Sequence, residues 1–271
     1  MVNRRLLHHL VLAVTALFFF LSSNKLSLSQ EFIALAIAVF IGTLFIYRLS
    51  VWVPILSSSS PFIHFYCKPL KLEIAAFFIL LVSTFYFLSL YEIILLVCWG
   101  LFSTFYFLNI KLGAFHFKGL RSIPLIKTIH LALLWTIIGF IFALPQVAIS
   151  KVLIFDFSIR FLILFLICLG VDLRDIAKDQ ETTKDFKIVT LATLFGFHKL
   201  KQLMLFVNLT LICLIMLFSP NSMLEVFIAS LLFIELILLK INSRTNTFTI
   251  LMDGTLLLYS FLAFMIQLTN F

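Results

Sequence analysis

The sequence predicts an all-α polytopic membrane protein with about nine transmembrane helices. Of the 271 residues, 63% are hydrophobic and only 12% are charged, and the mean hydropathy is +1.18. Soluble domains have roughly 45–50% apolar and 25% charged residues. Nine spans of about 20 residues leave roughly 90 residues for loops and tails. We therefore expect one transmembrane domain over residues 1–271 and no separate soluble domain.

Apolar runs bounded by polar or turn residues place the nine helices in order. The first follows a basic N-terminus, and we expect it to be retained because no small-x-small cleavage signal comes after it. The third and fourth are separated only by Tyr91 and Glu92, which predicts a tight helical hairpin. The expected spans are residues 6–21, 32–53, 72–90, 93–108, 126–144, 152–171, 203–218, 223–239 and 256–268.

The Lys and Arg residues orient this arrangement, because cytoplasmic loops of membrane proteins carry an excess of them. With the N-terminus inside and the C-terminus outside, 17 of the 20 Lys and Arg residues fall on inner segments. Only Lys25, Lys151 and Arg160 fall outside. The net charge of +8 is thus a signature of membrane topology, not of nucleic-acid binding. The long inner loops predict that the functional site lies on the cytoplasmic face. We expect the protein to be embedded in the lipid bilayer of the cytoplasmic (inner) membrane.

A cluster of carboxylates follows the sixth span. Five of the twelve acidic residues lie between positions 172 and 185. If the sixth helix continues through this segment, Asp172, Asp175 and Asp179 fall within about 60° on one face, and Arg174 and Lys178 on the other. Oxygen ligands at the mouth of a membrane cavity suit Mg²⁺ bridged to a diphosphate. The alternative is a solvated loop whose charges keep it in water.

The same segment resembles a motif of the UbiA-type intramembrane prenyltransferases. The string DLRDIAKD, from Asp172 to Asp179, is followed by Thr190-Leu191 and by Gly196, which matches the second aspartate-rich motif of that family. Nine helices, an N-terminus inside and long loops after the second, fourth and sixth helices agree with it. Residues 119–145 also look like the fourth loop and fifth helix of a divergent branch of the superfamily.

The resemblance implies a cavity that opens to the cytoplasm. In active members of the family, two aspartate motifs face each other and hold Mg²⁺ against a polyprenyl diphosphate, whose ionisation yields an allylic cation that alkylates an aromatic acceptor. The metal-binding positions that carry over are Asp172, Asp175 and Asp179. The expected activity is transfer of a polyprenyl group to an aromatic or quinone-precursor acceptor in the membrane.

This chain departs from the family at the first aspartate motif. That motif belongs after the second helix, yet no carboxylate occurs between Glu31 and Glu73. Arg48 stands in that region, and an arginine can contact diphosphate oxygens directly and bidentately. The departure leaves a second function open: a catalytically inactive relative that binds an isoprenoid or quinone lipid, or acts as an assembly partner. The candidate diphosphate-binding residues are Arg48, Lys118, Arg121, Arg174 and Lys178.

Two further carboxylates lie inside predicted spans or at their ends. Membrane-embedded carboxylates are rare and usually face an interior or a cavity. Glu235 and Asp253 could line the same chamber as Asp172, or pair with Lys240 and Arg244 at the membrane interface. A third function, solute transport, is weaker because no pair of Gly- or Pro-broken helices recurs in two halves. The acceptor, the prenyl length and the oligomeric state do not follow from the sequence.

Overall fold

The computed structural model describes most of the chain in detail. The described residues are 2–23, 29–56, 63–106, 110–112, 115–117, 120, 123, 125–140, 151–181, 191–219, 222–239 and 245–269. Lys240 and Arg244, expected above as possible partners of buried carboxylates, lie outside these ranges.

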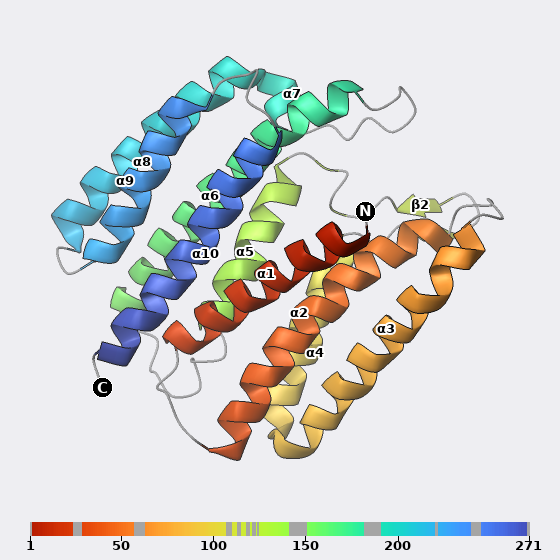
Figure 1. The fold of residues 1–271 in the computed structure, drawn as a ribbon. Helices are drawn as coiled ribbons and strands as arrows, with labels where there is room; N and C mark the ends of the chain where they lie inside the picture. Colours follow the sequence, from red (N-terminus) through yellow and green to blue (C-terminus); the bar gives the residue numbers. More distant parts are fainter. Residues whose placement is uncertain are drawn as a thin grey trace. The chain divides into compact units, whose positions relative to one another are not determined.

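Nine helices of at least 15 residues occur in the described part of the chain, together with one short helix, α7 (Figure 1). This confirms the predicted fold class and the expected number of long helices. The helices are α1 (Val2–Ser23), α2 (Gln30–Leu56), α3 (Ile63–Thr84), α4 (Leu90–Phe105), α5 (Ile126–Phe140), α6 (Lys151–Glu181), α7 (Leu191–Phe195), α8 (Phe197–Phe218), α9 (Met223–Leu238) and α10 (Thr245–Thr269).

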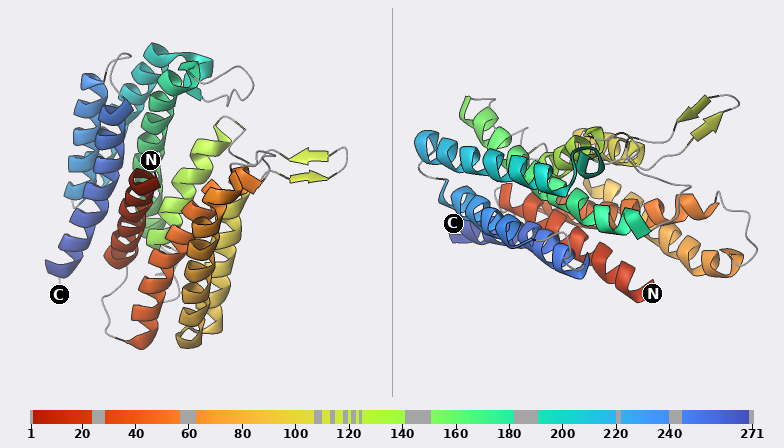
Figure 2. Two further views of the ribbon diagram at one scale, coloured as in Figure 1. Left: turned by 45° about the vertical axis from the view of Figure 1, so that its right-hand side comes forward. Right: turned by 90° about the horizontal axis from the view of Figure 1, so that it is seen from above.

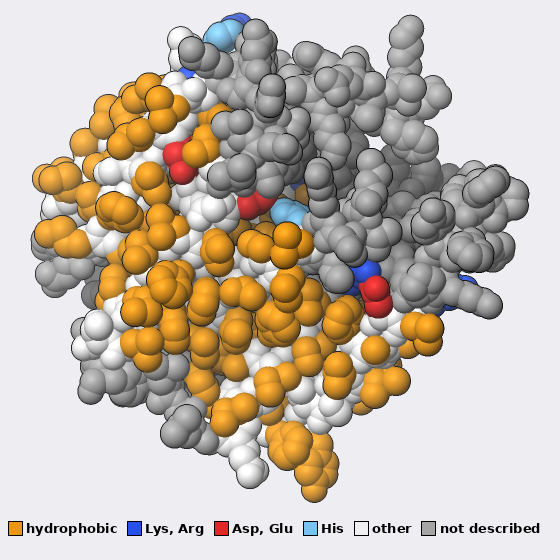
Figure 3. All heavy atoms as spheres, viewed as in Figure 1, with side chains coloured by type: hydrophobic (Ala, Val, Ile, Leu, Met, Phe, Trp, Pro, Cys, Tyr) orange, Lys and Arg blue, Asp and Glu red, His pale blue; other side chains and the backbone are white. Residues whose placement is uncertain are grey.

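The apolar composition of these helices is that of an integral membrane protein. Over the described residues, four helical segments are long and apolar enough to cross a bilayer: Gln30–Leu49, Leu153–Leu173, Phe197–Phe218 and Leu251–Thr269. Three shorter apolar helices are Leu7–Ser22, Leu90–Phe105 and Ile126–Gly139. Hydrophobic side chains also cover most of the described surface seen in Figure 3. In water such a surface would favour aggregation, whereas in lipid it is the expected one.

The chain divides into two compact units. Unit 1 comprises Met1–Gly119, Ile138–Pro145 and Phe264–Phe271, and unit 2 comprises Leu120–Ile137 and Gln146–Ala263. In unit 1, α2 packs against α1, α3 and α4. In unit 2, α6 packs against α7, α8 and α9, and α8 packs against α9. The expectation of a single domain over residues 1–271 stays a prediction.

Small residues accompany the packing of α1 against α2 in unit 1. Ala13 and Ala16 on α1 and Ala38 on α2 have no exposed surface. In a membrane the helices gain no hydrophobic free energy by leaving lipid, so close approach of backbones over small side chains is what favours their association. The α1–α2 pair follows this pattern.

The hairpin between α3 and α4 forms as predicted, but its turn lies earlier than expected. After α3, the short 3-10 helix η1 (Phe85–Phe87) leads to Ser89, the N-cap of α4. The Glu92 carboxylate accepts hydrogen bonds from the Ser89 amide and hydroxyl, both at 2.9 Å, and the Glu92 amide donates to Ser89 Oγ. This capping box satisfies amides that the first helical turn leaves without partners. Tyr91 and Glu92 therefore belong to the helix and not to the turn.

A short β-hairpin in unit 1 is a feature that the sequence patterns did not predict. Strand β1 (Ile110–Leu112) pairs antiparallel with β2 (Phe115–Phe117), with Lys111 opposite His116 (Figure 2). Three residues per strand are too few for the alternation of apolar and polar residues to identify them.

Gly170 on α6 marks a close contact between α6 and α10 in unit 2. A Cβ atom at this position would clash with the Sδ atom of Met252, whose side chain is fully buried. We predict that Gly170→Ala lowers the free energy of unfolding by about 1–3 kcal/mol through overpacking. Gly254→Ala is the matched control, because a Cβ atom added at Gly254 would meet no heavy atom within 4 Å. Chemical unfolding in one detergent measures both, and equal stabilities would contradict the close contact.

Candidate functional site

Helix α6 continues ten residues beyond the predicted end of the sixth span. The apolar run ends at Val171, but the helix ends at Glu181 and so includes Asp172, Asp175 and Asp179. Because the helix continues through all three positions, Asp172, Asp175 and Asp179 lie on one face of its backbone, as predicted. Apolar composition marks only the part of a helix that lies in hydrocarbon, and the helical hydrogen bonds continue past it.

Asp172 is held at both carboxylate oxygens by two consecutive residues of α5. Lys127 Nζ lies 2.6 Å from Oδ1, and Thr128 Oγ1 donates to Oδ2 at 2.7 Å. The Lys127 and Asp172 side chains are only 7% and 3% exposed. A buried carboxylate needs such compensation, because removal of a charge from water is costly unless it is paired and hydrogen-bonded. Asp172 thus has partners at both oxygens within unit 2.

The other candidate residues of this segment are placed only in part. Asp175, Asp179, Arg174 and Lys178 lie on α6, but their side chains are outside the described residues. Lys118 and Arg121 also fall outside them. The assignment of the three aspartates to a metal, and of these cations to a diphosphate, stays a prediction.

Arg48 forms an ion pair with Glu73 in unit 1. The pair joins α2 to α3, and the Arg48 side chain is 4% exposed while that of Glu73 is 35% exposed. Glu73 is the first carboxylate after the stretch in which the first aspartate motif of the family would lie. Arg48 therefore already has an anionic partner, and a diphosphate would have to compete with Glu73 for it.

Glu235 is a buried carboxylate on α9. The Thr255 hydroxyl on α10 donates to Glu235 Oε1 at 2.6 Å, and Glu235 is 7% exposed. Within the described part of the chain, no hydrogen-bond partner reaches its Oε2 atom. Asp253 lies on α10, two residues before Thr255. Lys240 and Arg244 are outside the described residues, so pairing of Glu235 or Asp253 with them stays untested.

Lys127, Thr128 and Glu73 are the partners in the candidate site that sequence reasoning missed. In the sequence, Lys127 is one of the 17 inner Lys and Arg residues that orient the chain, and Glu73 only marks the end of a stretch without carboxylates. One signal could have identified Lys127: it follows the first residue of an apolar helix, where a lysine either reaches the membrane interface or is paired. Nothing in the sequence pattern indicated Thr128.

Gly196 separates α7 from α8, and its backbone conformation explains why a glycine stands in this position. Its φ of 77° and ψ of 157° lie in a region that is accessible almost only to glycine. The backbone can therefore turn between the last residue of α7 and the first of α8 without a helical continuation. Any other residue would be strained here, even though the space that its Cβ atom would occupy is open.

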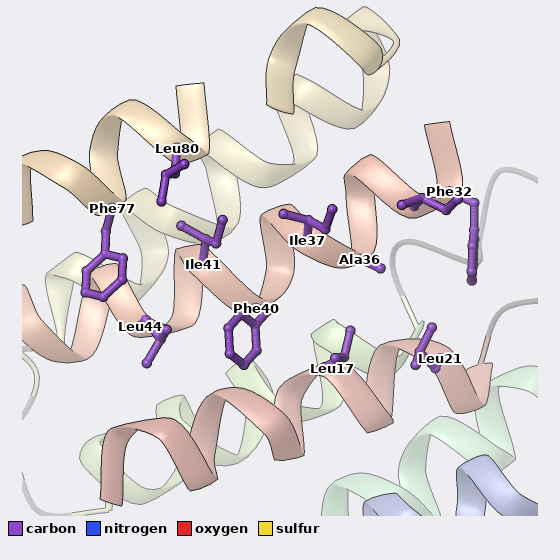
Figure 4. A pocket seen from close by; sticks show the side chains of 11 residues that line it. Leu17, Leu21, Phe32, Ala36, Ile37, Phe40, Ile41, Leu44, Phe77 and Leu80 are labelled. Atoms are coloured by element: carbon purple, nitrogen blue, oxygen red, sulfur yellow. The ribbon is translucent and has the colours of Figure 1, made fainter. Parts of the chain in front are cut away.

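Unit 1 contains an apolar pocket of about 760 Å³ (Figure 4). Its side chains come from α1, α2 and α3, and they include Leu17, Phe40 and Phe77. Every lining residue is aliphatic or Phe, so the pocket offers a polar headgroup no side-chain hydrogen bond. An alkyl or isoprenoid chain has the chemistry that such a lining accepts.

Comparison with known proteins identifies the fold. A UbiA homologue from Aeropyrum pernix K1 matches with a TM-score of 0.63 at 11% identity, and the match covers 99% of each chain. The chain has the UbiA fold. A digeranylgeranylglyceryl phosphate synthase matches with a TM-score of 0.59 at 16% identity, and the match covers 100% of each chain. A UbiA homologue from Archaeoglobus fulgidus, bound to GPP and Mg²⁺, matches with a TM-score of 0.55 at 12% identity. This match covers 96% of the present chain and 99% of the homologue.

Comparison of the sequence alone does not identify a family. No family model matches it, and no curated protein matches it either. The structural matches establish the fold, and at 11–16% identity they leave the activity open. The fold expected from the aspartate motif and the helix count is nevertheless confirmed. The synthase is described in membranes, in agreement with the apolar helices of this chain.

The described residues of this UbiA-fold chain do not fit a Mg²⁺ ion at Asp172. Mg²⁺ demands near-octahedral oxygen ligation at about 2.0–2.1 Å and gives up its water reluctantly. Both oxygens of Asp172 are occupied by an ammonium and a hydroxyl group. In the part of the chain that the structure describes, no three His, Cys, Asp or Glu side chains gather into a metal-binding group. No step of the chemistry is therefore assigned to a metal here.

Proposed function

We propose that the chain is a divergent UbiA-type prenyltransferase. It would transfer a polyprenyl group from a polyprenyl diphosphate to an aromatic or quinone-precursor acceptor in the membrane. The observation that carries the proposal is the continuation of α6, in a chain with the UbiA fold, through Asp172, Asp175 and Asp179. Two UbiA-fold neighbours, one a synthase and one bound to GPP and Mg²⁺, support the substrate class.

The proposed reaction breaks the bond between the first prenyl carbon and the diphosphate oxygen. Diphosphate leaves with the electron pair, the acceptor carbon bonds to the prenyl carbon, and the acceptor loses a proton. Preorganised cations that face the developing charge of the leaving group stabilise this transition state. Arg174 and Lys178 on α6, together with Arg48, Lys118 and Arg121, are the candidates for that role. Asp175 and Asp179 remain the candidates for any metal that the diphosphate brings with it.

The test is diphosphate release by the purified full-length protein in proteoliposomes. Labelled polyprenyl diphosphates of several lengths are supplied with candidate aromatic acceptors, with and without Mg²⁺. We expect Asp175→Asn and Asp179→Asn each to lower turnover by about 10²–10³-fold, as does loss of one electrostatic stabiliser in other enzymes. Glu31→Gln, an exposed carboxylate in the first turn of α2, should leave turnover unchanged. Equal turnover in all four proteins would refute the assignment of the aspartates.

A second candidate function is a catalytically inactive UbiA-fold protein that binds an isoprenoid or quinone lipid, or acts as an assembly partner. The ion pairs of Asp172 with Lys127 and of Arg48 with Glu73 favour it, because each occupies a residue that the reaction would need. Mass spectrometry of the lipid that copurifies with the protein, in a preparation without diphosphate release, would support this function. Acceptor-dependent release of diphosphate would exclude it.

We also propose that the protein lies in the cytoplasmic membrane with its N-terminus inside. The apolar helices support a membrane location, and the uneven distribution of Lys and Arg supports the orientation. With this orientation the charged end of α6 faces the cytoplasm, where water-soluble diphosphate leaves.

A further inference from the structure

Lys127 occupies the space beside Asp172 that a metal ion would need. Its ammonium nitrogen lies 2.6 Å from Asp172 Oδ1, and Thr128 holds Oδ2 at 2.7 Å. A divalent ion at the same carboxylate would have to displace the ammonium group or share the site with it. A divalent ion bound to this carboxylate would lie close to the ammonium group of Lys127. The two positive charges would repel strongly, because the Lys127 and Asp172 side chains are less than a tenth exposed and little water screens them.

The backbone just before Lys127 has an unusual conformation. Leu125 has a φ of 64°, the only positive value of a non-glycine residue among those described. This conformation is unfavourable for a bulky side chain and persists only where the surrounding structure imposes it. The amides of Lys127 and Ile129 nevertheless donate to the carbonyls of Ile123 and Leu125 at 3.0 and 2.8 Å. Lys127 and Thr128 thus stand on an ordered first turn of α5.

Lys127 supplies the counter-charge of Asp172. One ammonium group neutralises one carboxylate, and the Thr128 hydroxyl satisfies the second oxygen. A lysine on a neighbouring helix can thus supply the counter-charge that a buried aspartate needs.

We propose that Lys127 is a tethered cation that replaces a metal ion at Asp172, so that Asp172 binds no divalent ion while Lys127 is present. The inference takes from the proposed function only that Asp172 belongs to the ligand site. A ligand bound at this end of α6 would then meet a neutral pair, and its negative charge would have to be balanced by other cations. Ligand binding would not depend on a metal held by Asp172.

The experiment is a titration with Mn²⁺ alone, followed by electron paramagnetic resonance, of the full-length protein in nanodiscs without prenyl substrate. We compare wild type, Lys127→Met and the double variant Lys127→Met/Asp172→Asn. Lys127→Met should bind one more Mn²⁺ per chain than wild type, and the double variant should return to the wild-type number. Lys201→Met is the control, because this lysine of α8 donates to the Ile237 and Leu239 carbonyls and its loss uncovers no carboxylate oxygen of Asp172.

Equal Mn²⁺ binding by wild type and Lys127→Met would overturn the inference. If Lys127→Met does not give a folded protein, Lys127→Gln replaces it, because glutamine can donate a hydrogen bond to Asp172 and removes the charge. The titration contains no diphosphate, so absence of prenyl transfer leaves its result unaffected. Conversely, an additional Mn²⁺ in Lys127→Met would stand whether or not the protein proves to be an enzyme.

Discussion

In metal-free solution, Lys127→Met should be among the least stable single variants of this protein. It leaves the Asp172 carboxylate, 3% exposed, without its counter-charge. Removal of one partner of a buried ion pair typically costs about 3–5 kcal/mol. Asp172→Leu should also be strongly destabilising, because it leaves the ammonium group of Lys127, whose side chain is only 7% exposed, without its counter-charge. Reversible unfolding in a single detergent measures each free energy.

The double variant Lys127→Met/Asp172→Leu separates lost charge pairing from poor packing. Replacement of a buried ion pair by apolar residues of similar volume is often neutral or stabilising, so we expect it to recover most of the stability that Lys127→Met loses. Thr128→Val is the matched control, and loss of its single hydrogen bond to Asp172 should cost about 1 kcal/mol. A double variant as unstable as the sum of the single variants would contradict a direct Lys127–Asp172 interaction.

The helices were predictable because hydropathy acts over many residues at once. All nine apolar runs form helices, yet some helices extend beyond the predicted spans where charged residues occur. Helix α6 extends to Glu181, and α3 begins at Ile63. In both places the helix includes charged residues, Lys68 and Lys71 in α3 and those from Asp172 to Glu181 in α6, which a pattern based on apolar composition cannot follow. The short helix α7 and the β-hairpin have too few residues to show a period.

The partners in the candidate site were not predictable for a different reason. Lys127 and Asp172 are 45 residues apart, and Arg48 and Glu73 are 25 apart. A single sequence shows which charged residues lie near the membrane, and the scarcity of carboxylates indicated that each is important. It does not show which cation meets which anion, because that depends on which helices the fold brings together, here α5 with α6 and α2 with α3.

Glu73→Gln should destabilise unit 1 by leaving Arg48 without its anionic partner. Arg48 is 4% exposed on α2, and in the described structure no hydrogen-bond partner reaches its Nε atom. We expect a loss of about 2–4 kcal/mol, somewhat below the usual cost for a fully buried pair, because the Glu73 side chain is 35% exposed. The free energy of unfolding in detergent measures this loss. Glu92→Gln, at the capping box of α4, tests whether loss of another carboxylate of unit 1 has the same effect.

The reverse substitution distinguishes a structural arginine from a ligand-binding one. Arg48→Met removes the buried charge and leaves Glu73, which is exposed enough to be solvated, so it should be less destabilising than Glu73→Gln. If Arg48 also binds diphosphate, Arg48→Met should weaken the binding of a polyprenyl diphosphate, whereas Glu73→Gln should strengthen it by releasing the guanidinium group. Binding of a radiolabelled polyprenyl diphosphate in nanodiscs measures both effects. Unchanged affinity in both variants would restrict Arg48 to joining α2 and α3.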